Sequence, residues 1–256
     1  MQLDGASALV VGGAGGFGAA TVRRLAAAGA AVLIADMAED KGKALEGSIG
    51  SDRVRFMATD VTQVDSVAAA VAAAREFGPL RVAVAVHGGP AAGRRIVNRK
   101  GEFYPLDTFR RTIDVFLNGS YNVLSQAAAA MTTNDPLDSG QRGVVIMTAS
   151  IAGFEGQVGQ TDYSAAKGGV ISLTLTAARD LAPAGVRVMT IAPGTFFTPA
   201  YGMSEEEAEA KWGPGVPNPK RMGRADEYAR LALQIVDNDY LNGEAIRIDG
   251  ALRFNI

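Results

Sequence analysis

Short apolar runs alternate along this chain with longer alanine-rich stretches, and this alternation limits the possible fold more than any other feature. The runs are nearly continuous in apolar residues, which is typical of strands covered on both faces. They are Ala8–Val11, Ala31–Ala35, Val54–Met57, Val82–Val86, Val144–Met147, Val186–Ile191 and Ala245–Ile248. Helices are predicted over Gly16–Gly29, Val64–Phe77, Leu106–Met131, Tyr163–Leu181 and Ala225–Asp237. This order predicts an α/β fold, a doubly wound parallel sheet of about seven strands with helices on both faces, in a single domain covering 1–256.

Composition excludes several kinds of chemistry. The 256 residues contain no Cys, which rules out disulfides and thiolate sites, and one His, which rules out a site of several imidazoles. The net charge of −2 gives no reason to expect nucleic acid as a partner. No apolar run approaches the ~18–20 residues that span a membrane, and the first residues lack the basic start and apolar core of a signal peptide. We therefore expect a cytoplasmic protein whose chemistry depends on Ser, Tyr, Lys, Asp or a cofactor.

A glycine-rich segment, Gly12–Gly18, joins the first predicted strand to the first helix. Glycines allow a sharp turn there and let a pyrophosphate approach the free N–H groups of the helix N-terminus. The second strand ends in Asp36, where a carboxylate accepts hydrogen bonds from ribose hydroxyls and repels a 2′-phosphate. Asp60 ends the third strand and is placed to meet the adenine edge. The context predicts a Rossmann-type dinucleotide site that takes NAD rather than NADP.

Tyr163 and Lys167 are four residues apart and so share one face of a predicted helix. A free Tyr has a pKa of about 10, too high for easy proton transfer at neutral pH, and a nearby cation lowers it. Ser150 ends the fifth strand, 13 residues before Tyr163, where it is placed to hold a substrate oxygen. Together with the glycine loop, these residues predict proton transfer beside a nicotinamide.

The glycine loop, Asp36, Ser150, the Tyr-Lys pair and Ala192–Gly194 together resemble the short-chain dehydrogenase/reductase family over essentially the whole chain. Other segments resemble its subfamily of type 2 3-hydroxyacyl-CoA dehydrogenases, also described as 17β-hydroxysteroid dehydrogenases type 10. These segments are Gly140–Val144, Phe154–Gln160, Ala178–Pro183, Arg187–Gly194 and Leu241–Glu244. The resemblance implies an NAD-dependent homotetramer of fatty acid metabolism that interconverts a secondary alcohol and a ketone, most closely 3-hydroxyacyl-CoA and 3-ketoacyl-CoA.

The resemblance also implies roles for single residues. Tyr163 removes the alcohol proton and returns it in reduction, Lys167 lowers the Tyr pKa and binds the nicotinamide ribose, and Ser150 polarises the substrate oxygen. The cofactor-binding residues that it implies are Gly12, Gly16, Phe17, Gly18, Asp36, Asp60, Val61, Gly88, Tyr163, Lys167, Pro193, Gly194, Thr195 and Thr198.

Three positions depart from the family pattern. Val11 stands where the glycine loop usually begins with Thr, and Ala85–Gly88, with a loop residue at His87, replaces an Asn-containing segment. Phe116 replaces the catalytic Asn and cannot hydrogen-bond the water that links the lysine to bulk proton exchange. Asn118 is not expected to substitute for it, because two residues turn an α-helix by about 200°. Either another group or water completes this relay, or turnover is weak.

Two long connections follow strand ends, where ligands bind in such sheets. Pro90–Pro105 resembles the subfamily's insertion and is rich in basic residues: Arg94, Arg95, Arg99 and Lys100. The segment 195–222 contains an acidic helix candidate at Glu205–Glu209 and is predicted to be a substrate lid. Two other functions stay open. One is a hydroxysteroid or small-ketone reductase, if the basic residues form only a solvated loop; the other is a weakly active dinucleotide-binding protein, which Phe116 motivates.

Overall fold

The computed structural model describes residues 1–89, 93–198 and 202–254. Seven parallel strands form one sheet in the order β3-β2-β1-β4-β5-β6-β7, which confirms the doubly wound arrangement. The strands are β1 (Ser7–Val11), β2 (Ala31–Asp36), β3 (Val54–Ala58), β4 (Leu80–Ala85), β5 (Gly143–Thr148), β6 (Val186–Pro193) and β7 (Ala245–Ile248).

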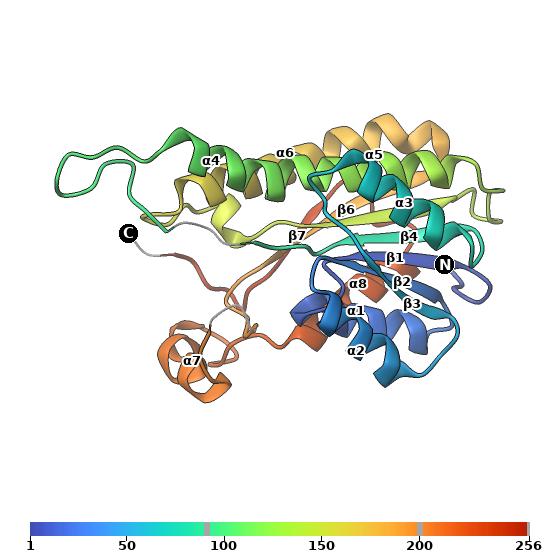
Figure 1. The fold of residues 1–256 in the computed structure, drawn as a ribbon, viewed down its shortest axis with the longest axis horizontal. Helices are drawn as coiled ribbons and strands as arrows, with labels where there is room; N and C mark the ends of the chain where they lie inside the picture. Colours follow the sequence, from blue (N-terminus) through green and yellow to red (C-terminus); the bar gives the residue numbers. More distant parts are fainter. Residues whose placement is uncertain (90–92, 199–201, 255–256) are drawn as a thin grey trace.

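Helices cover both faces of this sheet (Figure 1). One face carries α3 (Val64–Arg75), α4 (Leu106–Ile113), α5 (Gly119–Thr132) and α6 (Thr161–Leu181), and the other carries α1 (Gly16–Ala27), α2 (Glu39–Ile49) and α8 (Ala225–Asp237). A further helix, α7 (Glu205–Trp212), lies away from both layers. Within the described ranges, no helix is long and apolar enough to cross a lipid bilayer.

The apolar core has two layers, one on each side of the sheet. Successive side chains of a strand point to opposite faces. Leu9 of β1 therefore packs in the layer under α3, α5 and α6, whereas its neighbour Val10 packs in the layer under α1 and α8. All five residues of β1 are buried, as are all residues of β4, β5 and β6. This two-sided burial explains why the strands read as continuous apolar runs.

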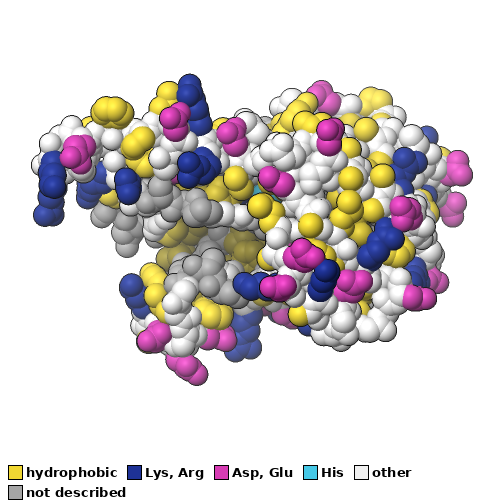
Figure 2. All heavy atoms as spheres, in the orientation of Figure 1, with side chains coloured by type: hydrophobic (Ala, Val, Ile, Leu, Met, Phe, Trp, Pro, Cys, Tyr) yellow, Lys and Arg dark blue, Asp and Glu magenta, His cyan; other side chains and the backbone are white. Residues whose placement is uncertain are grey.

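The direction in which the sheet grows reverses at β1, because β2 and β3 lie on one side of it and β4 to β7 on the other. The loops after β1 and β4 diverge at such a point, and ligands bind there. Residues 93–104, which we call the arm, follow β4, and α7 follows β6, so both project from the carboxyl edge of the sheet (Figure 1). Figure 2 shows a surface hollowed between them.

Two helical features differ from the sequence-based expectation. Helix α2 was not predicted, because its buried positions are only Gly42 and Leu45 and it lacks a broad apolar stripe. The predicted long helix from Leu106 to Met131 is interrupted by η1 (Asp114–Asn118), a π-helical segment between α4 and α5. The first helix, in contrast, ends where expected, with Gly29 in a positive-φ conformation (+94°) just after it.

Candidate active site

The glycine loop lies at the carboxyl edge of the sheet, between β1 and α1. Gly12 has a φ of +81°, and its N–H donates to the carbonyl of Ala35 on the neighbouring strand (2.7 Å). A Cβ on Gly12 would lie 2.4 Å from the backbone of His87, and a Cβ on Gly18 would lie 2.0 Å from the carbonyl oxygen of Gly12. Only glycine fits at these two positions. The loop backbone therefore packs directly on the end of β4 and on the first turn of α1.

The outer side of the same loop is open. Helix α1 starts at Gly16 without a side-chain cap, and a Cβ on Gly15 would meet no atom within 4 Å. Thr198 lies beside the loop, with its Cγ2 3.5 Å from the position of a Cβ on Gly16. The ring of Phe17 stacks inward on Tyr228, with centroids 4.6 Å apart, so Phe17 offers the loop only its backbone N–H. An uncapped helix N-terminus under an open glycine surface fits the pyrophosphate of a dinucleotide.

The two predicted acids have different surroundings. Asp36 is held against the glycine loop, because its Oδ2 accepts from the N–H of Ala14 (3.0 Å) and its Oδ1 from the N–H of Ala38 (2.9 Å). Each oxygen keeps a lone pair, so the carboxylate can still accept from ribose hydroxyls. In Asp60, Oδ1 accepts from the N–H and the hydroxyl of Thr62 (2.9 and 2.8 Å). The Asp60 side chain thus stabilises the turn that leads into α3.

Other predicted cofactor-binding residues lie just after β3 and β4 and at the end of β6. Val61 is buried, and its carbonyl accepts a hydrogen bond from α5 (2.9 Å). Gly88 is exposed, and a Cβ there would meet no atom within 4 Å. Pro193 ends β6, and Gly194 packs so closely on Asp249 that a Cβ would lie 2.6 Å from that side chain. The structure therefore gathers these residues along the same edge as the glycine loop.

The two ends of the predicted lid, 195–222, lie next to each other. The carbonyl of Thr195 accepts from the N–H of Gly223 (2.9 Å), which joins the two ends of the segment. Between them, α7 is capped by the side chain of Ser204, and residues 199–201 lie outside the described residues. The segment thus forms an excursion over the carboxyl edge of the sheet.

Tyr163 and Lys167 lie one turn apart near the start of α6. Lys167 is 3% exposed, and its Nζ donates to the carbonyl oxygen of Thr148 at the end of β5 (2.6 Å). The same nitrogen lies 5.8 Å from the centroid of the Tyr163 ring. Burial lowers the pKa of Lys167 from its usual 10.5 to about 7. The structure therefore brings an amine that titrates near neutral pH close to a phenol.

Ser150 lies two residues after Thr148. Its Oγ accepts a hydrogen bond from the N–H of Ala152 (3.1 Å), so its own O–H is left to donate to a substrate oxygen. Next to it, Gly153 packs on α6 so closely that a Cβ would lie 2.8 Å from the carbonyl carbon of Lys167. The segment that carries Ser150 is thus fixed against the turn of α6 that carries Lys167.

Phe116 fills the space beside these two side chains. Its ring is 4% exposed and meets the Tyr163 ring edge-on, with centroids 5.2 Å apart and an interplanar angle of 89°. Lys167 Nζ lies 4.8 Å from the centroid of the Phe116 ring. An aromatic face attracts an ammonium group but offers it no hydrogen bond. Phe116 therefore supports the cation electrostatically, but its side chain cannot hydrogen-bond a water molecule as an Asn side chain would.

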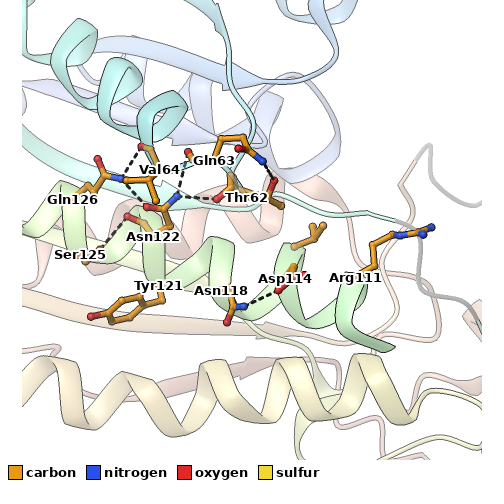
Figure 3. A pocket seen from close by; sticks show the side chains of 12 residues that line it. Thr62, Gln63, Val64, Arg111, Asp114, Asn118, Tyr121, Asn122, Ser125 and Gln126 are labelled. Carbon is orange, nitrogen blue, oxygen red and sulfur yellow. Dashed lines mark hydrogen bonds between the residues drawn. The ribbon is translucent and has the colours of Figure 1, made fainter. Parts of the chain in front are cut away.

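Asn118 does not take the place of an Asn at position 116, as expected. It lies at the end of η1, is exposed, and its Nδ2 donates to Oδ1 of Asp114 (2.8 Å). Both side chains line an open pocket between α5 and the turn before α3 (Figure 3), and its volume is about 790 Å³. The widened turn of η1 thus directs Phe116 to Tyr163 and Lys167, and Asn118 away from them. Such π-helical turns are frequent at functional sites.

Replacing Phe116 with Asn or with Leu should move the pKa of Lys167 in opposite directions. Asn adds a polar group that solvates the ammonium, so the pKa rises. Leu keeps the burial but removes a cation–π contact of about 1–2 kcal/mol, which lowers the pKa by about one unit. The NMR chemical shift of Lys167 Cε, followed across the pH range, measures this pKa. Shifts in the same direction for both variants would contradict the role of the ring.

His87 follows β4 in a loop, as expected, but it is buried. It is 8% exposed, and burial, with the nearby Lys167 ammonium, lowers its pKa to about 3, so the ring is neutral at physiological pH. Its Nε2 donates to the carbonyl of Val115 in η1 (3.0 Å), and Nδ1 then has no hydrogen-bond partner among the described residues. His87 therefore joins the end of β4 to the π-helical segment.

The arm, residues 93–104, is an extended loop whose two sides pair with each other. Val97 and Phe103 form an antiparallel bridge across it. Four basic side chains of the arm are exposed and form no ion pair with any described residue: Arg94, Arg95, Arg99 and Lys100. Figure 2 shows Lys and Arg side chains gathered at its outer end. The first residues of this connection, 90–92, lie outside the described ranges.

Sequence reasoning missed a buried acid next to Tyr163 and its partner in the arm. Asp162 precedes Tyr163 and is 1% exposed, and its carboxylate accepts a hydrogen bond from the hydroxyl of Tyr104 at the end of the arm (2.9 Å). Acids are common in the first turn of a helix because they interact favourably with the helix dipole. The sequence pattern therefore does not distinguish this buried acid from an exposed one.

Comparison with known proteins agrees with this geometry. The family model for short chain dehydrogenases matches residues 6–209. The chain is 45% identical to 3-hydroxyacyl-CoA dehydrogenase type-2 of Homo sapiens, covering 98% of this chain and 97% of that protein. It is 36% identical to cis-4-hydroxycyclohexanecarboxylate dehydrogenase of Sinomonas cyclohexanicum, covering 95% and 94%. The crystal structure of 3-hydroxyacyl-CoA dehydrogenase type-2 from Mycobacterium avium has a TM-score of 0.96 at 53% identity, covering 99% and 98%. This chain belongs to the short-chain dehydrogenase family of oxidoreductases.

Proposed function

We propose that this protein is an NAD-dependent 3-hydroxyacyl-CoA dehydrogenase. One observation carries the reaction type: Lys167, fixed on the end of β5, lies close to the Tyr163 ring on the edge of the sheet that also holds the glycine loop. The substrate class is supported by two relatives named as 3-hydroxyacyl-CoA dehydrogenases type-2, which match nearly the whole chain. The cofactor class, a nicotinamide dinucleotide, follows from the family.

The chain's own residues divide the work as follows. The bound nicotinamide supplies hydride transfer. The hydroxyl of Ser150 donates to the substrate oxygen, on which negative charge develops. The hydroxyl of Tyr163 exchanges the proton of that oxygen, and the ammonium of Lys167 lowers the pKa of the phenol. The ring of Phe116 attracts that ammonium and excludes water from the side that it covers.

The arm supports a CoA ester as substrate. CoA carries several phosphate groups, and Arg and Lys side chains bind phosphates through charge-assisted hydrogen bonds. We propose that the four unpaired basic residues of the arm bind these phosphates at the entrance of the site, and that the segment 195–222 closes over the substrate as a lid.

The function is tested by comparing two ketones that share the acetoacetyl group. NADH oxidation is measured with acetoacetyl-CoA and with ethyl acetoacetate, beside a steroid ketone. Rapid turnover confined to the CoA ester supports the proposal and shows that Phe116 is tolerated. Turnover of the uncharged ketones alone would refute it. If NADH binds and nothing is reduced, a gain of turnover in Phe116→Asn would show that the ring interrupts the proton relay.

NADH should bind at least about tenfold more tightly than NADPH, a difference of about 1.4 kcal/mol. The reason is Asp36, because a 2′-phosphate would meet its carboxylate at the glycine loop. Fluorescence titration with both dinucleotides measures the ratio. Asp36→Ser should bring the two affinities closer, whereas Asp60→Asn, whose carboxylate is engaged in a turn, should not. Equal affinities in the wild-type protein would exclude selection by Asp36.

We also propose that the protein is a homotetramer. The outer helices of one layer carry exposed apolar side chains, including Tyr121 on α5 (57% exposed) and Leu175 on α6 (46% exposed). Apolar surface of this kind is commonly covered in an assembly. Light scattering coupled to size-exclusion chromatography measures the mass of the assembly in solution.

A further inference from the structure

A buried carboxylate connects three elements beside the reaction centre. Asp162 lies in the first turn of α6, immediately before Tyr163, and is 1% exposed. Its Oδ2 accepts from the hydroxyl of Thr112 on α4 (2.6 Å) and from the hydroxyl of Tyr104 at the end of the arm (2.9 Å). One oxygen atom therefore links α6, α4 and the arm.

This carboxylate is held in its ionised form. Burial alone would raise the pKa of Asp162, but hydrogen bonds from Thr112 and Tyr104 and from the N–H groups of Tyr163 and Asp162 together hold that pKa below its usual value. Hydrogen bonds to an ionised acceptor are roughly twice as strong as those between neutral groups. The hydrogen bond by which Tyr104 joins the arm to α6 is consequently stronger than one between two neutral groups.

The arm is tied to the start of α6 at both of its ends. At one end, the N–H of Tyr104 donates to the carbonyl of Ile96 (2.8 Å), so the contact with Asp162 also holds the opposite strand of the arm. At the other end, Gly93 packs on Gly159, where a Cβ would lie 3.5 Å from the carbonyl group of Gly93. Between these anchors the arm projects outward (Figure 1) and carries its exposed basic side chains.

We propose that Asp162 is a positioning residue that holds the basic arm in place relative to Tyr163, and so sets the affinity for substrates with an anionic handle. It acts through Tyr104 and does not touch the substrate. This inference rests on the proposed function, in which the acyl group reaches Tyr163 while the phosphates of CoA lie on the arm. A misplaced arm would then weaken binding of the CoA ester without altering the chemistry at the ketone.

Tyr104→Phe tests the proposal, because it removes only the hydroxyl that joins the arm to Asp162. The KM for acetoacetyl-CoA should rise about five- to tenfold, with kcat within twofold of wild type. Both constants for ethyl acetoacetate, which has no anionic handle, should stay unchanged. Hydrogen exchange of the amides in 93–104 should become faster. Tyr240→Phe is the matched control, since Tyr240 is 98% exposed, and it should change none of these values.

A second pair of variants separates positioning from general damage to the fold. Thr112→Ser keeps the hydroxyl that binds Asp162 and should behave like wild type, whereas Thr112→Val should raise the KM for the CoA ester. Equal losses with both ketones, or a fall in kcat alone in Tyr104→Phe, would overturn the proposal. If the wild-type protein reduces only uncharged ketones, the proposed substrate is wrong, and the affinity part of this proposal fails with it. Hydrogen exchange still tests whether Asp162 holds the arm in place: unchanged exchange in Tyr104→Phe would refute that part of the proposal.

Discussion

Replacing Tyr163 with Phe should lower kcat by roughly 10²–10⁴-fold, the range that a positioned general acid–base group contributes. The substitution removes the hydroxyl that exchanges the substrate proton and leaves a ring of nearly the same shape. The edge-on contact with Phe116 and the packing of Lys167 are therefore kept. The measurement is steady-state NADH oxidation with acetoacetyl-CoA, together with a fluorescence titration of NADH, whose dissociation constant should change little.

A matched substitution shows whether loss of any tyrosine hydroxyl has this effect. Tyr240 is 98% exposed, so Tyr240→Phe should keep full activity. Turnover of Tyr163→Phe within tenfold of wild type would mean that another group transfers the proton. Loss of NADH binding together with turnover would show that the hydroxyl serves cofactor binding, and the fall in turnover would then not measure proton transfer.

Replacing Lys167 with Met should abolish turnover yet stabilise the cofactor-free protein at and below neutral pH. Burial holds the pKa of Lys167 at about 7 in the folded state, against 10.5 for a free lysine. Between these two values the unfolded chain keeps the proton that the folded chain has lost, so the free energy of unfolding rises with pH, by about 1.4 kcal/mol per unit. The full cost of the buried charge therefore applies below about pH 7 and is absent above pH 10.5. Met has a similar length and no charge.

The expected gain in the free energy of unfolding is smaller than the pKa shift of Lys167 alone implies. Met leaves the carbonyl of Thr148 without its hydrogen-bond donor, at a cost of about 1–3 kcal/mol. Calorimetric unfolding of both proteins at pH 6 and pH 10 measures the difference, which should shrink as the pH rises. The exposed Lys220 provides the control, since Lys220→Met should leave the pH dependence unchanged. A difference between the two proteins that stays the same from pH 6 to pH 10 would show that Lys167 stays charged throughout.

The sheet was predictable because its strands are buried on both faces and therefore consist of short apolar runs, as in Val144–Met147. Helix α2 was not predictable in the same way. Its eleven residues bury only Gly42 and Leu45, so no stripe at helical spacing stands out. The difference is physical: a central strand must be apolar throughout, whereas a helix at the rim of the sheet needs few contacts.

The candidate site also has parts that the sequence predicts and parts that it does not. The pairing of Tyr163 with Lys167 is local, since it depends only on the spacing of two residues on one helix. The orientation of Phe116 depends on η1, and a widened helical turn hardly changes the apolar pattern of the sequence around it. The partner of Asp162 lies 58 residues away in the arm, so only the folded chain shows which hydroxyl it meets.

The hollowed face in Figure 2 lies between the arm and α7, which form its two walls. The arm has four basic residues and one acidic residue, whereas α7 has four acidic residues, Glu205, Glu206, Glu207 and Glu209, and one basic residue, Lys211. At an ionic strength of 0.1 M such fields reach about 10 Å into solution, a distance shorter than an extended CoA ester. We therefore expect a molecule with phosphates at one end and an uncharged chain at the other to be turned during its approach, before any contact forms. An anion of uniform charge experiences no such torque, so we expect the two walls to select molecules by how their charge is distributed as well as by how much charge they carry.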